Sequence, residues 1–126
     1  MSMRTPLGKV RGLGSAKDGT EHFWRQRLTA VANVPLMIFF VLFLVVYTGK
    51  THAVVAEALS NPFVSVLFGL MIISGLTHMR LGMQVIIEDY IHSEGLKIVC
   101  LLANTFFSIT VGAVALFAVL KLGFGG

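Results

Sequence analysis

The sequence predicts an all-α membrane protein with three transmembrane helices. Of the 126 residues, 56% are hydrophobic and only 13% are charged, whereas soluble domains carry about 25% charged residues. The mean hydropathy of +0.84 points the same way. Three stretches contain no Asp, Glu, Lys or Arg: residues 28–49, 58–79 and 98–120. Each reaches the length of about 20 residues at which a helix spans a bilayer.

Membrane-spanning strands do not fit these stretches. A barrel strand has only about 9–11 residues and alternates apolar with polar side chains, an alternation that is missing here. Because lipid offers no partners for free backbone N–H and C=O groups, helices are the remaining way to cross. We predict spans at about residues 28–49, 60–87 and 98–120, the second continuing across Arg80.

Residues 1–27 are predicted to form a basic cytoplasmic tail, ahead of a three-helix transmembrane anchor domain at 28–126. In the loop after the first span, Lys50 is the only Lys or Arg. The tail contains six: Arg4, Lys9, Arg11, Lys17, Arg25 and Arg27. The positive-inside rule therefore predicts a cytoplasmic N-terminus and, with three spans, a C-terminus on the opposite side.

The tail does not resemble a targeting segment. Its polar and basic residues precede the first apolar run without a cleavage pattern after a short apolar core, so no signal peptide is expected. The acids Asp18 and Glu21 disfavour a transit peptide. We expect a multi-pass protein of the bacterial inner (cytoplasmic) membrane rather than the mitochondrial inner membrane.

The net charge of +4 is explained by topology and by contact with anionic lipid heads, so no nucleic-acid partner is expected. The single Cys100 can form neither an intrachain disulfide nor a metal site by itself. Three spans enclose too little volume for a large active site, and partner subunits are therefore expected.

The second span carries polar groups in the segment SGLTHMRLGMQVIIEDYIH, which ends at His92. At about 100° per residue, Asp89 lies on the same helix face as His78, and Gly75 and Gly82 flank the histidine there. One interpretation is a small-residue packing surface with His78 hydrogen-bonded to a neighbouring helix. The other is a metal ligand, with haem iron the best candidate because the glycines leave room for a macrocycle.

The other histidines, His22, His52 and His92, lie outside the predicted hydrocarbon region. A second axial histidine would therefore come from another chain. Arg80 lies about 200° around the helix from His78 and either snorkels to the cytoplasmic surface or pairs with a partner protein.

An acid and a phenol, Asp89 and Tyr90, follow each other at the predicted cytoplasmic end of the second span. They suit a quinone, whose carbonyl oxygens accept hydrogen bonds and take up protons on reduction. The alternative for Tyr90 is an anchor in the interfacial aromatic belt. Glu88 is interpreted as a solvated charge at the head-group level.

Two motifs carry a family resemblance. HMRLGMQVIIEDYIH has a glycine four residues after its histidine and Asp-Tyr at eleven and twelve, and HFWRQRLTAVANVPL begins the first span. Together they resemble the small hydrophobic membrane-anchor subunit of succinate dehydrogenase (complex II). The resemblance implies that His78 is an axial ligand of a b-type haem shared with a partner protein. It further implies that Tyr90 hydrogen-bonds ubiquinone beside Asp89 and that Arg27 is a candidate contact for the haem propionates.

The resemblance also implies a division of labour. The partners would be the cytochrome b subunit, which supplies the other haem ligand, an iron–sulfur subunit and a flavoprotein subunit. FAD, the iron–sulfur clusters and succinate oxidation would belong to those partners, since this chain has no cysteine cluster and no dinucleotide fingerprint. Two alternatives stay open: a b-haem anchor of a related fumarate reductase, and a non-redox membrane scaffold.

Overall fold

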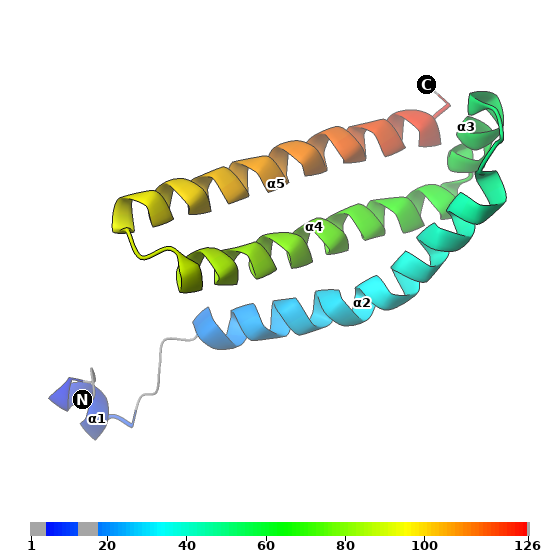
Figure 1. Cartoon of the computed structure of the whole chain (residues 1–126). Helices are drawn as coiled ribbons and strands as arrows, with labels where there is room; N and C mark the ends of the chain where they lie inside the picture. The colour runs from blue at the N-terminus through cyan, green and yellow to red at the C-terminus, as the bar shows by residue number, and fades with distance from the viewer. Residues whose placement is uncertain (1–4, 13–17, 126) are drawn as a thin grey trace.

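The computed structural model describes residues 5–12 and 18–125, and its regular elements there are α-helices. These are α1 (Pro6–Val10), α2 (Asp18–Tyr47), α3 (His52–Ser60), α4 (Pro62–Tyr90) and α5 (Glu94–Gly123). Each long helix runs antiparallel to the one before it, and α4 lies between α2 and α5 in contact with both (Figure 1). Each of the three is long and apolar enough to cross a membrane, which confirms the predicted number of spans.

The long helices extend beyond the predicted spans. α2 begins at Asp18, inside the predicted tail, where the exposed Arg25 and Glu21 side chains form an i,i+4 ion pair of the kind that supports a helix outside lipid. It is also bent (Figure 1) and contains Pro35, which cannot donate an intrahelical hydrogen bond. α4 runs to Tyr90, so the candidate quinone residues form its last turn.

The two short helices were not predicted. α3 occupies the loop expected between the first two spans and contacts α4 and α5. Thr51 caps its first turn, and Asn61 both ends α3 and caps α4 by accepting a hydrogen bond from Phe63 N at 3.0 Å. α1 lies in the predicted tail and is likewise capped by a threonine, Thr5. Such caps stabilise helices of any length, while a search for apolar spans detects only long ones.

Contacts between the long helices are mainly apolar, with a few polar links. Phe68 of α4 meets the rings of Phe39 and Phe43 of α2 edge to face, with centroids 5.5 and 4.9 Å apart. Among the described residues, only two hydrophobic side chains, Leu81 and Ile87, are buried. The remaining apolar surface suits contact with lipid or with other membrane subunits.

We expect Gly112→Leu to separate α4 from α5. A Cβ built at Gly112 already lies 3.1 Å from Leu76 Cδ1, so a larger side chain should overpack the contact at a cost of about 1–3 kcal/mol. The free energy of unfolding, measured by denaturant titration in detergent micelles, checks this. Gly69→Leu is the matched control, because no described atom lies within 4 Å of a Cβ there. Equal losses for both variants would contradict the prediction.

Candidate functional site

His78 lies in the contact between α4 and α2 and is half-buried. Its Nδ1 is 3.2 Å from Oγ1 of Thr29, a residue 49 positions earlier in the chain. This hydrogen bond between helices is what the packing interpretation predicted. The other ring nitrogen, Nε2, is not among the buried unpartnered atoms and has no hydrogen-bond partner in the described part of the chain. One nitrogen therefore holds the helices together while the other stays free to bind.

The two glycines beside His78 have different surroundings. At Gly82 a Cβ would lie 3.5 Å from Nε2 of Gln26, an ordinary van der Waals distance, so Gly82 faces α2. At Gly75 no described atom lies within 4 Å of a Cβ position. Gly75 thus leaves open space one turn from the histidine. A flat macrocycle bound to His78 Nε2 would need such a space, and the residues present fit a haem.

A second polar contact lies one turn away. Ser74 donates a hydrogen bond to Asn33 Oδ1 at 2.8 Å, and its Oγ is 3.4 Å from the carbonyl oxygen of Thr29. Ser74 and His78 are four residues apart on α4, as Thr29 and Asn33 are on α2. The two helices are therefore joined by polar contacts in two successive turns.

Asp89 and Tyr90 are both exposed at the end of α4, and Tyr90 has 78% of its surface accessible. Glu88 is also exposed and accepts a hydrogen bond from Gln84 at 2.9 Å, in keeping with a solvated head-group charge. In a lone chain the phenol of Tyr90 would be open to its surroundings. Any quinone pocket here would need walls from partner subunits.

Arg27 is not brought next to His78. It is exposed, and its guanidinium lies 5.2 Å from the ring centroid of Phe23. Two residues separate Arg27 from Thr29, or about 200° around α2, so Arg27 lies on the face of α2 away from α4. The contact of Arg27 with the haem propionates, which the resemblance implied, stays a prediction.

Arg80 lies inside the second predicted span, in the half nearer the predicted cytoplasmic end. It is half-buried, and its backbone carbonyl accepts a hydrogen bond from Asn104 Nδ2 of α5 at 3.0 Å. It also lines a small polar hollow of about 190 Å³ together with Glu21, His22, Arg25, Leu81 and Gln84. Three of these neighbours come from the first turns of α2, so Arg80 lies beside the polar start of that helix.

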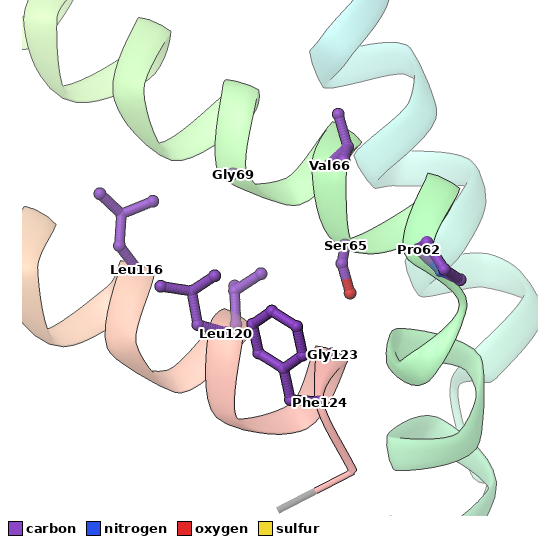
Figure 2. Close-up of a pocket in the computed structure, with 9 residues that line it drawn as sticks. Pro62, Ser65, Val66, Gly69, Leu116, Leu120, Gly123 and Phe124 are labelled. Atoms are coloured by element: carbon purple, nitrogen blue, oxygen red, sulfur yellow. The ribbon is translucent and has the colours of Figure 1, made fainter.

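A larger cavity of about 450 Å³ lies between α4 and α5 at the opposite end of α4 from Tyr90. Figure 2 shows its apolar lining, including Leu116, Leu120 and Phe124. Its one hydroxyl, on Ser65, already donates to the carbonyl oxygen of Leu59. The cavity therefore offers no free polar side chain to orient a quinone, and it is not the predicted quinone site.

Within the described residues, no group of three or more His, Cys, Asp or Glu side chains could hold a metal ion. A metal bound through His78 would thus need ligands from a cofactor or another chain.

The sequence did not predict a role for Thr29, although this residue belongs to the same motif as Arg27. The one sequence feature that could have indicated a role for Thr29 is its polar side chain in a largely apolar helix.

Comparison with known proteins identifies the family. The family described as succinate dehydrogenase/fumarate reductase transmembrane subunit matches residues 1–119. The succinate dehydrogenase hydrophobic membrane anchor subunit of Paracoccus denitrificans is 29% identical over 121 residues, covering 96% of this chain and 93% of the relative. That of Rickettsia bellii is 32% identical over 106 residues, covering 84% and 85%.

A third relative, the succinate dehydrogenase membrane anchor subunit of Reclinomonas americana, is 33% identical over 86 residues, covering 66% of this chain and 72% of the relative. No solved structure shows significant similarity to the chain. With three apolar helices of spanning length and matches along most of its length, the chain belongs to the succinate dehydrogenase/fumarate reductase transmembrane subunit family, as a hydrophobic membrane anchor subunit.

Proposed function

We propose that this anchor subunit supplies, through His78, one axial ligand of a b-type haem and, through Tyr90 and Asp89, part of a ubiquinone-reduction site. The observation that carries the haem role is the free Nε2 of His78, which is neither buried nor hydrogen-bonded in the described residues. The open position at Gly75 supports it. A haem bound there would supply a one-electron carrier between the soluble redox centres and the membrane.

The quinone role rests on chemistry at the end of α4. Tyr90 carries a hydroxyl donor for a quinone carbonyl, and Asp89 beside it is a proton-handling group. Both are exposed, so a partner surface can close over them. Tyr90 lies twelve residues beyond His78, or about 18 Å along the helix. The proposed haem and quinone sites therefore lie on the same helix but use different residues.

Partner subunits complete both sites. Among the described histidines, His22 belongs to the first turns of α2, His52 begins α3, and His92 follows α4. None is on a middle turn of a long helix as His78 is, so the second haem ligand would come from the cytochrome b subunit. The iron–sulfur subunit would dock near Tyr90, and the flavoprotein would oxidise succinate. The N-terminus and the α4–α5 link would face the cytoplasm of a bacterium, as the basic residues predict.

A scaffold without redox function is the second candidate. The bond between His78 and Thr29 favours it, because a histidine that only joins two helices would show the same contact. A fumarate reductase anchor would need the same histidine and could favour menaquinone. The scaffold would leave Nε2 without a ligand, whereas both redox anchors would bind haem there.

We expect the complex purified with its partner subunits to show Soret and α bands in a reduced-minus-oxidised absorption spectrum. The anchor expressed alone should give no six-coordinate bis-histidine haem, unless two copies place their His78 side chains across a two-fold axis. A complex without these bands would remove the haem role and favour the scaffold. Recovery of a bis-histidine haem from the isolated monomer would refute the shared ligand set.

A further inference from the structure

We propose that Thr29 is a positioning residue for His78. Its hydroxyl oxygen accepts a hydrogen bond from Nδ1–H of His78, and this bond selects the tautomer in which Nε2 carries the free electron pair. The inference rests on the proposed role of His78 as a haem ligand. It adds a second residue of this chain, from a different helix, to the ligand environment.

The direction of this hydrogen bond follows from the other partners of the hydroxyl. Thr29 Oγ1 is 2.8 Å from the carbonyl oxygen of Arg25 and 3.1 Å from that of Gln26. Carbonyl oxygens only accept, so the single hydroxyl hydrogen is donated to the backbone of α2, as is common for threonine in membrane helices. The oxygen then faces His78 Nδ1 at 3.2 Å with a lone pair. In neutral imidazole, a proton on Nδ1 leaves Nε2 as the acceptor atom.

The opposite arrangement is unfavourable. If Thr29 donated its hydrogen to Nδ1, its hydroxyl oxygen would lie close to the two carbonyl oxygens with no hydrogen between them. Oxygen lone pairs would then repel one another. The proton of the ring would then be on Nε2, which has no acceptor among the described residues and could not ligate a metal. Both hydrogen-bond satisfaction and ligation therefore favour Nδ1–H as the donor.

The register of the two helices is held by a neighbouring contact. Ser74, one turn before His78, donates to Asn33, one turn after Thr29, at 2.8 Å. This second link limits sliding and rotation of α4 against α2. It therefore helps to keep His78 opposite the hydroxyl of Thr29.

This arrangement predicts a measurable effect on a bound haem. A ligand histidine that donates its other N–H is more basic, and loss of that partner typically weakens metal binding by about 10–100-fold. A more basic ligand favours the oxidised iron. Removing the acceptor should therefore shift the haem midpoint potential in the positive direction.

The experiment compares Thr29→Val and Thr29→Ser in the complete complex with its partner subunits. Valine keeps the branched shape but has no hydroxyl, whereas serine keeps the hydroxyl. Thr77→Val is the matched control, since it makes the same change beside His78 on α4 outside the hydrogen bond. The readouts are the haem midpoint potential, the g values of the oxidised haem in electron paramagnetic resonance, and the rate of haem transfer to excess apomyoglobin.

We expect Thr29→Val to raise the potential, change the g values and speed haem loss about 10–100-fold. Thr29→Ser and Thr77→Val should match the unmodified complex. If valine prevents assembly, Thr29→Ala removes the same hydroxyl with less steric change and is read in the same way. Wild-type values in the valine or alanine variant would overturn the proposal, and so would a serine variant that behaves like valine. A haem that survives His78→Ala would instead refute the proposed function, so the two failures are distinguishable.

Discussion

Replacing His78 with alanine in the assembled complex should remove the b-type haem signal or convert it to a different ligation state. The imidazole would be one of two axial ligands, and no other described histidine lies on a middle turn of a long helix to replace it. Quinone reduction should fall less than haem content, because electrons could pass directly from the iron–sulfur subunit to the quinone. The measurement is the reduced-minus-oxidised spectrum together with succinate-driven ubiquinone reduction.

The control for this variant is His92→Ala. His92 is exposed beyond the end of α4 and is outside the proposed ligand set, so its replacement should leave the spectrum intact. An unchanged spectrum in the His78→Ala complex would return this residue to a helix-packing role. If His78→Ala prevents assembly, the anchor will be absent from the purified complex. His78→Gln, which keeps a polar side chain, then replaces the alanine variant in the same comparison.

Replacing Tyr90 with phenylalanine should slow ubiquinone reduction by roughly five- to 150-fold. The substitution keeps the ring but removes one hydroxyl donor, and loss of a hydrogen bond to a buried acceptor costs about 1–3 kcal/mol. Haem content should be unchanged, because Tyr90 is about 18 Å along α4 from His78. The measurement compares succinate-driven reduction of ubiquinone with that of an artificial acceptor that takes electrons from the soluble subunits.

Asp89 provides the second half of this experiment. Asp89→Asn should impair the same step if the acid orients the phenol or transfers protons, and its effect should be non-additive with that of Tyr90→Phe. Glu88→Gln is the matched control, since Glu88 is a neighbouring exposed acid already paired with Gln84. Equal losses with both acceptors, or none with ubiquinone, would assign Tyr90 to the aromatic belt.

The sequence by itself determined the membrane class, the number of long helices and the candidate ligand. Long charge-free stretches are sufficient for this, because lipid excludes unpaired backbone groups and leaves few alternatives. Helical periodicity likewise placed His78 and Asp89 on one face, since that depends on spacing within a single helix. The motifs around His78 and Tyr90 also identified the family, which the match over residues 1–119 confirmed.

Short helices and helix ends were harder to predict from the sequence. α3 was missed because a capped helix of 9 residues has no span-length signal. The start of α2 at Asp18 was missed because the apolar run begins later than the helix. Thr51 caps the start of α3, and the Glu21–Arg25 ion pair supports the first turns of α2, so neither start depends on an apolar run.

Only the tertiary structure decided which residues meet across the helices. The contact between Thr29 and His78 joins positions 49 residues apart, and its existence depends on the register and rotation of α2 against α4. Those two quantities are set by many side chains at once, including the phenylalanines around Phe68 and the Ser74–Asn33 bond. The same rotation places Arg27 on the face of α2 away from α4, which spacing within one helix could not predict. A spacing rule describes one helix, whereas a site between helices exists only after they have packed.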